Sequence, residues 1–438
     1  MDLEDPASVC WRGGDSRTWP ERAWRRRAIT VLMVAGLLAS MALNAVVGWP
    51  DASGALTFAQ RMSGVLFVLS GLVLGAAAIA AFDYQGRRQF RFSGAIVLLG
   101  VLITLATDSL LLFMWFEEME YTHYALVFMS LWCWSVWMLW LLVRGKAWQG
   151  VPGPKRFAAG VVATALLTGV SLAYSTMYQP AAAPMHFILK AEFGKPRADR
   201  TLPFIHVPVT LYMRNTGEIP VYIINDIFTI RGRNAQYSDR PERGDFVREW
   251  KESAEVWGDP GNAERHVRKI RYTKLSSGHF YGPGSRLETG QEYTLQHVFQ
   301  LPKDPSYDTI SVDLQVSYMR KDRGKLDVET FGTPHYSWSE GEGRYYCPPE
   351  RGCSPRLVYH GRLRHNNNLV NVTRKTRYVT AIWYPGDDDP ISSISSFDYG
   401  LESGFEREER RELDRYGATK VRANSAVPVA ELLTSSGA

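Results

Sequence analysis

The sequence predicts a membrane all-α bundle of five transmembrane helices followed by a mainly-β extracytoplasmic domain. Five long apolar segments occupy the first 178 of the 438 residues, and the rest is more polar, with stretches that alternate between apolar and polar side chains. Long apolar segments cross membranes as helices, whereas alternation with a period of two is typical of strands with one buried face.

Each apolar segment is long enough to cross a bilayer, because roughly 20 residues at about 1.5 Å per residue span about 30 Å of hydrocarbon. The segments are Ala28–Trp49, Gly64–Phe82, Ala95–Phe116, Tyr121–Val143 and Phe157–Tyr178. Short connectors join them, so residues 28–178 form one predicted transmembrane domain.

Flanking positive charges predict the orientation of the helices. On one side lie Arg12, Arg17, Arg22, Arg25, Arg26, Arg27, Arg87, Arg88, Arg91, Arg144, Lys146, Lys155 and Arg156. The connectors on the other side carry only Arg61. Cytoplasmic loops are the ones rich in Lys and Arg. Residues 1–27 are therefore a predicted cytoplasmic tail, and the region after Tyr178 is predicted to lie outside the plasma membrane.

The alternative for the first segment is a cleaved signal peptide. Its apolar run is longer than the usual core of such a peptide, and no convincing cleavage site follows it. Cleavage would leave four spans and the same extracytoplasmic location for the region after Tyr178.

The formal net charge of +5 does not indicate a nucleic-acid partner. After residue 178, Asp and Glu nearly balance Lys and Arg, and the earlier basic residues flank the apolar segments. Such a distribution indicates membrane topology. Arg is much commoner than Lys, which is typical of bacteria with high-GC genomes. The lipid bilayer is the expected partner of the first half.

Asp108 is the most distinctive polar residue inside the predicted spans. An ionised carboxylate in hydrocarbon costs several kcal/mol unless it faces protein or water. The polar side chains on the spans that could reach it are Asn44, Ser70, Thr104, Thr107 and Ser130. Two roles are open, a hydrogen-bonded Asp that joins two helices and a site that handles ions or protons.

A second polar group lies on the turn between the third and fourth segments. It consists of Glu117, Glu118, Glu120 and His123. Carboxylates with an imidazole can hold a divalent cation. The alternative is an acidic, solvated loop, which also fits the predicted orientation.

Two further patterns concern the interior of the bundle. Gly71 and Gly75 form a GxxxG sequence, which lets two helices approach closely. Apart from His123 at a margin, no His lies in a predicted span, which argues against a bundle that holds b-type haem. We expect no cofactor.

Strand patterns begin after the linker Gln179–Pro184. Ile205–Met213 and Ile310–Tyr318 alternate cleanly, as half-buried strands of an antiparallel sheet do. Further strands are predicted at Phe187–Phe193, Val221–Ile230, Val267–Tyr272, Tyr293–Leu301 and Arg377–Tyr384. Many strands without alternating long helices indicate a β-sandwich, placed at residues 185–330.

Ile205–Ile230 reads as a strand, an Asn-Thr-Gly turn and another strand. This stretch resembles part of an immunoglobulin-like extracytoplasmic domain. The resemblance is architectural, and it implies a fold but no function.

Residues 331–438 are predicted to be an irregular or β extension, either part of the sandwich domain or a separate module. Within it, residues 331–376 have no clear periodicity. Glu406–Tyr416 is a predicted short helix, with Gly417 as its stop signal. Ala418–Ala438 is predicted to be irregular.

Cys347 and Cys353 are the cysteines of the region predicted to lie outside the membrane. They are close in the sequence, and extracytoplasmic compartments are oxidising, so a local disulfide is predicted.

The sequence contains no nucleophile elbow, zinc-protease motif or P-loop. The favoured hypothesis is a non-enzymatic plasma-membrane protein whose β domain binds an envelope protein or a cell-wall polymer. One alternative is ion- or proton-coupled transport through the bundle by way of Asp108. A second alternative is an interfacial membrane enzyme with a metal at Glu117, Glu118, Glu120 and His123.

Overall fold

The computed structural model divides the chain into two compact units. It describes residues 19–55, 58–85, 92–118, 120–145, 185–199, 201–237, 247–248, 251, 267–339, 355–384, 390–396 and 406–436. The helical unit comprises Met1–Gln179 and Asn366–Lys375. The β unit comprises Pro180–His365 and Thr376–Ala438.

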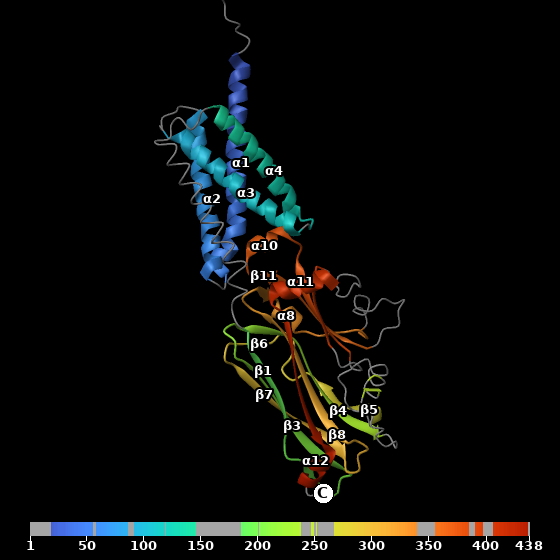
Figure 1. Ribbon diagram of the computed structural model, residues 1–438. Helices are drawn as coiled ribbons and strands as arrows, with labels where there is room; N and C mark the ends of the chain where they lie inside the picture. The colour runs from blue at the N-terminus through green and yellow to red at the C-terminus, as the bar shows by residue number, and fades with distance from the viewer. Residues whose placement is uncertain are drawn as a thin grey trace, which may run out of the picture. The chain divides into compact units, whose positions relative to one another are not determined.

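The described part of the helical unit contains four long helices (Figure 1). They are α1 (Trp19–Gly54), α2 (Phe58–Gln85), α3 (Ser93–Glu118) and α4 (His123–Arg144). Each contains a stretch long and apolar enough to cross a membrane. A multi-pass membrane protein is therefore supported. The fifth predicted span, Phe157–Tyr178, lies outside the described residues, so five spans remain a prediction.

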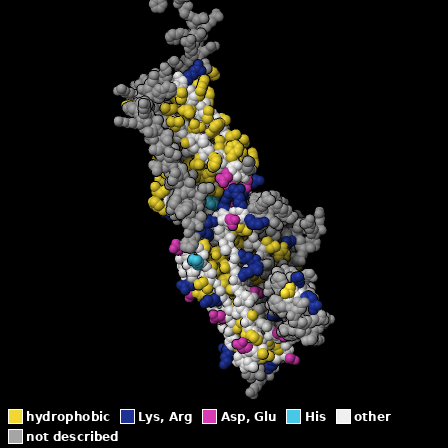
Figure 2. Space-filling view, viewed as in Figure 1, with side chains coloured by type: hydrophobic (Ala, Val, Ile, Leu, Met, Phe, Trp, Pro, Cys, Tyr) yellow, Lys and Arg dark blue, Asp and Glu magenta, His cyan; other side chains and the backbone are white. Residues whose placement is uncertain are grey.

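The outward faces of these helices are apolar. Leu72, Ile79 and Phe113 are among the large apolar side chains left exposed, and apolar side chains are abundant over this unit in Figure 2. A helix that is apolar on all sides belongs in a core or in lipid. The inward faces pack around Leu37, Leu74 and related side chains.

Glycines let α1 and α2 approach each other closely. A Cβ on Gly64 would lie 2.3 Å from the backbone nitrogen of Ala52 and 2.7 Å from the carbonyl oxygen of Gly48. Gly71 lies near the carbonyl oxygen of Met41, and a Cβ on Gly75 would lie 3.1 Å from the Met41 sulfur. Small residues therefore line this interface, as is common between membrane helices.

The described residues of the β unit form three antiparallel sheets. The first sheet holds β1 (Phe187–Phe193), β2 (Arg197–Ala198), β3 (Phe204–Asn215) and β7 (Glu292–Pro302). The second sheet holds β4 (Val221–Tyr237), β5 (Val267–Gly278), β6 (Arg286–Leu287), β8 (Thr309–Arg320) and β14 (Thr419–Pro428). The third sheet holds β9 (Gly324–Leu326), β10 (His335–Tyr336), β11 (Leu357–His365), β12 (Arg377–Trp383) and β13 (Ile391–Ser395).

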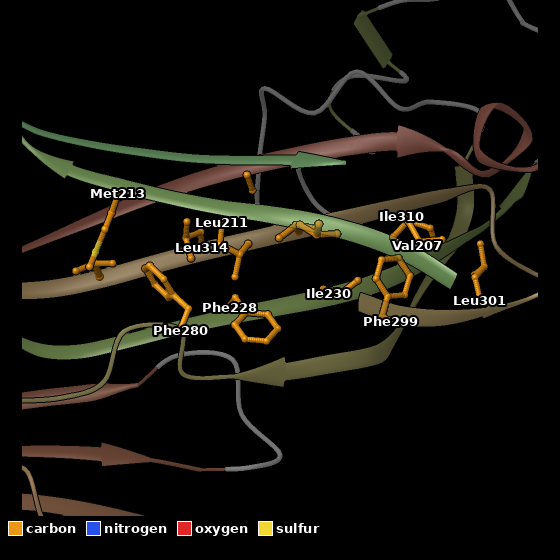
Figure 3. Close-up of a cluster of buried hydrophobic side chains, with 14 of the residues drawn as sticks. Val207, Leu211, Met213, Phe228, Ile230, Phe280, Phe299, Leu301, Ile310 and Leu314 are labelled. Atoms are coloured by element: carbon orange, nitrogen blue, oxygen red, sulfur yellow. The ribbon is translucent and has the colours of Figure 1, made fainter. Parts of the chain in front are cut away.

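The first and second sheets share one apolar core. Leu211 of β3, Leu314 of β8 and Phe228 of β4 point toward one another in it (Figure 3). The alternation of Ile205–Met213 predicts one buried face. The residues at every second position, from Ile205 to Met213, are indeed all fully buried. A mainly-β domain of antiparallel sheets is confirmed, whereas an immunoglobulin-like topology remains a prediction.

The third sheet packs around a second core, which also contains Tyr222 and Ile224 of β4. Both faces of this end of β4 are therefore buried. The expectation that residues 331–376 are irregular is wrong for β11 and for α10 (Asn368–Thr373). Their apolar residues are too few and too interrupted to show a period, and tertiary burial compensates for the weak local pattern.

The expectation that Ala418–Ala438 is irregular is also wrong. Thr419–Pro428 is strand β14, which pairs with β8 along its whole length, from Thr419 opposite Tyr318 to Pro428 opposite Thr309. Helix α12 (Val429–Ser436) follows it. Small and polar side chains conceal this strand in the sequence, and pairing with β8 stabilises it. The predicted helix Glu406–Tyr416 is present as α11 with the same bounds.

Candidate functional site

The most unusual polar group in the bundle is the carboxyl of Asp108 in α3. The residue is 1% exposed, and neither carboxyl oxygen has a hydrogen-bond partner among the described residues. Buried polar groups are nearly always hydrogen-bonded. The carboxyl of Asp108 therefore departs from the general rule inside a membrane helix.

Three of the five predicted partners of Asp108 form hydrogen bonds elsewhere. Asn44 donates from Nδ2 to the carbonyl oxygen of Ser40 at 2.9 Å. Thr107 donates from Oγ1 to backbone carbonyls of its own helix, and Ser130 does the same in α4. The helix-joining role for Asp108 therefore has no hydrogen bond to support it among the described residues.

Asp108 lies at the level of a polar layer, which we define as Ser40, Asn44, Thr104, Asp108 and Ser135. Each of these residues is at most 2% exposed. In α1, α3 and α4 they lie between or beside the residues of two apolar clusters. The bundle thus contains buried polar side chains between two apolar regions.

Two contacts bring α1 and α4 against the part of α3 that carries these residues. A Cβ on Gly100 of α3 would lie 3.3 Å from Leu37 of α1, and the two helices run in the same direction (Figure 1). Ser40 in α1 and Thr104 in α3 each follow this contact by about one helical turn. From α4, Trp132 donates to the hydroxyl of Ser109 at 3.0 Å, which brings α4 against this part of α3.

The metal site suggested for the acidic turn between α3 and α4 stays a prediction. No group of three or more His, Cys, Asp or Glu side chains that could hold a metal ion occurs there or elsewhere in the described part of the chain. Glu120 instead accepts a hydrogen bond from the backbone N–H of Lys375 at 2.8 Å. The ring of His123 lies edge-on to Tyr121, 6.1 Å away.

The ten residues Asn366–Lys375, which we call the docking segment, connect β11 to β12 but belong to the helical unit. Asp51, in the last turn of α1, accepts from the backbone N–H of Asn368, with distances of 2.9 and 3.0 Å to its two carboxylate oxygens. The side-chain amide of Asn368 donates to the carbonyl oxygens of Val46 and Val47. The carbonyl oxygen of Val46 has no donor within α1, because the residue four positions later is Pro50, which lacks an N–H.

Apolar contacts add to these bonds. Leu369 and Val372 of α10 are buried in a cluster with residues of all four long helices, including Val47, Phe67 and Phe128. Asn367 accepts from the backbone N–H of Leu369 at 3.0 Å and so caps the short helix. Sequence reasoning missed the docking segment because a six-residue helix with two buried apolar residues has no measurable period.

A buried Asp–His pair in the β unit was also missed. Asp226 of β4 is fully buried, and its carboxylate accepts from the backbone N–H groups of Phe280, Tyr281 and Gly282. The Nδ1 atom of His279 lies 3.5 Å from the same carboxylate. A signal was present, because Asn225 and Asp226 interrupt the apolar run Val221–Ile230.

The surroundings of this pair alter two pKa values. Burial alone would lower the pKa of His279, but the hydrogen bonds and charge of Asp226 outweigh burial and raise it above its ordinary value. Burial, aided by the charge of Asp226, raises the pKa of Tyr359 to about 12. His279 packs between Tyr359 and Trp383, so the pair joins the second sheet to the third.

The structure describes one of the four cysteines. Cys347 and Cys353 lie outside the described residues, so their disulfide remains a prediction. Cys133 of α4 is a free, exposed cysteine.

Comparisons with known proteins assign no family. No family model matches the chain, and no curated protein is significantly similar to it. Two solved structures are weakly similar. The putative ApaA protein from Bordetella pertussis is 11% identical with a TM-score of 0.16, over 32% of this chain and 84% of that one. Spo0M, a sporulation control protein from Bacillus subtilis, is 10% identical with a TM-score of 0.19, over 57% of this chain and 94% of that one. These similarities are too low to support conclusions about fold or function.

Proposed function

We propose that the chain is a non-enzymatic plasma-membrane protein that presents its β unit outside the cell to bind an envelope protein or a cell-wall polymer. The observation that carries the proposed location of the β unit is the docking segment. It bonds to Asp51 at the end of α1 and to Glu120 between α3 and α4.

These two positions support the proposed orientation. The charge distribution predicts, independently of the structure, that the end of α1 and the turn between α3 and α4 lie on the extracytoplasmic side of the membrane. A segment between two strands of the β unit binds the same helix ends. Both observations favour an extracytoplasmic β unit and a cytoplasmic N-terminus.

An aromatic pair offers a contact for the partner. Trp338 is 58% exposed, and its ring lies 5.1 Å from that of Tyr336 on β10. Strand β10 is at an edge of the third sheet. Exposed Trp and Tyr side chains are enriched among the residues that dominate binding energy at interfaces.

Orientation is tested by labelling intact cells with a membrane-impermeant maleimide. Cys placed at Thr216, in an exposed turn of the β unit, is expected to react, whereas Cys placed at Ser16 of the N-terminal tail is expected to react only after lysis. The native cysteines are first replaced by Ser. Labelling of Ser16→Cys but not Thr216→Cys in intact cells would reverse the proposed topology.

Partner binding is tested by crosslinking in native membranes and by sedimentation with purified cell-wall polymer. Capture is expected to fall at least about tenfold in Trp338→Ala, as for a residue that contributes 1.4 kcal/mol or more. The matched control is Tyr272→Ala, which removes an equally exposed aromatic residue from β5. Equal capture by both variants and the wild type would exclude the aromatic pair as the contact.

A further inference from the structure

We propose that the polar layer of the bundle is a binding site for a monovalent inorganic cation, with the carboxylate of Asp108 as its charged ligand. This site is separate from the partner-binding role of the β unit, and the proposal concerns binding and not flux.

The first argument is the set of unused oxygen atoms. Both carboxyl oxygens of Asp108, the hydroxyl of Thr104 and the hydroxyl of Ser40 are buried without a hydrogen-bond partner among the described residues. Thr104 and Asp108 lie one turn apart on the same face of α3. Ser40 follows Leu37, which packs against Gly100 of α3, by about one turn of α1. Oxygen atoms of this kind are the ligands that hard cations prefer.

The second argument is the absence of a positive side chain that could pair with Asp108. The Lys and Arg residues of the four helices lie near helix ends, and α3 has none. The predicted fifth span, Phe157–Tyr178, contains no Lys, Arg or His. A protein cation therefore does not neutralise Asp108 from within the spans.

The third argument is charge balance in a medium of low dielectric constant. A lone carboxylate is costly to bury, and a neutral ion pair is far less so. One monovalent cation neutralises one carboxylate, whereas a divalent cation would leave an uncompensated positive charge. Every residue of the polar layer is buried, so a cation bound there would be shielded from both water and lipid.

The test is the thermal unfolding of the purified full chain in phosphatidylcholine nanodiscs at alkaline pH. LiCl, NaCl and KCl are titrated at constant ionic strength against choline chloride. We expect one inorganic cation to raise the Tm saturably, because a ligand that binds only the folded state stabilises it. The shift is expected to disappear in Asp108→Asn and to persist in Ser130→Ala, whose hydroxyl bonds to its own helix.

Thr104→Val provides a milder variant. This variant removes the hydroxyl of Thr104. A contribution of about 1.4 kcal/mol to the binding free energy would then be lost, and the apparent Kd for the cation is expected to rise about tenfold. The wild-type titration tests cation binding even if Asp108→Asn does not fold. A Tm that responds equally to choline and to the inorganic cations would overturn the proposal. A Tm that depends on pH alone, with no difference between cations, would show that Asp108 binds only a proton and would also overturn it.

Discussion

The helical unit and the β unit both bury carboxylates, but they stabilise them to very different degrees. Asp226 in the β unit accepts three backbone N–H bonds and has His279 beside it. Asp51 in the helical unit accepts from one backbone N–H, that of Asn368. Asp108 accepts none from the described residues.

This series separates a structural role from a binding role. A buried carboxylate surrounded by donors has no bonding capacity left, so Asp226 organises the turn after β5. A buried carboxylate without donors is destabilising as it stands, so Asp108 needs another way to be neutralised. Burial is similar for both residues, and hydrogen bonding distinguishes them.

The largest effect is expected for Asp226→Ala. Removing this carboxylate leaves three backbone N–H groups and His279 without their acceptor, so the free energy of unfolding of the β unit should fall by about 3–5 kcal/mol. Urea unfolding of the full chain in detergent, followed by hydrogen exchange in β4, measures it. Asp313→Ala is the control, because the partly exposed pair of Asp313 with Arg231 is worth about 1 kcal/mol or less.

A smaller effect is expected for Asp51→Ala. The backbone N–H of Asn368 would lose its acceptor, at a cost of about 1–3 kcal/mol to the attachment of the docking segment. Hydrogen exchange in Asn366–Lys375 should accelerate accordingly. Ser53→Ala, which changes an exposed hydroxyl at the same end of α1, should have no effect. Unchanged exchange in Asp51→Ala would show that apolar contacts alone hold the segment.

A pH-dependent effect is expected at His279. Its pKa in the folded protein lies above the ordinary value of 6.5. The stabilisation from this shift is fully present below pH 6.5 and is lost as the pH rises through the higher folded value. The Tm of the wild type should therefore decline over this range, and His279→Gln should flatten the decline. His186→Gln, at an exposed position, should leave it unchanged.

The smallest effect is expected for Asp108→Asn in choline chloride without inorganic cations. Because Asp108 makes no hydrogen bond in the described part of the structure, its replacement should not lower the Tm of the helical unit. Leu111→Ala, one turn further along α3, removes a buried side chain and should cost about 2–5 kcal/mol. A loss in Asp108→Asn as large as that in Leu111→Ala would reveal a partner for Asp108.

Sequence reasoning identified the elements that have a strong local period. The four described helices follow from long apolar runs, and β3 and β8 follow from strict alternation. It also singled out Asp108, because a carboxylate in an apolar run is conspicuous. Sequence reasoning failed where local patterns are weak, as in β14, α10 and the pair of Asp226 with His279. Their stability comes from residues distant in the sequence.

The sequence by itself therefore determined the division of the chain into membrane helices and a mainly-β region, since transfer of side chains to lipid or to a sheet core depends mostly on local hydrophobic pattern. Tertiary structure alone decided which buried carboxylates have partners. It also decided that Asn366–Lys375 joins the helices and that Thr419–Pro428 pairs with β8. Hydrogen bonds and close packing depend on which distant backbone groups and side chains meet, and no local pattern in the sequence records that.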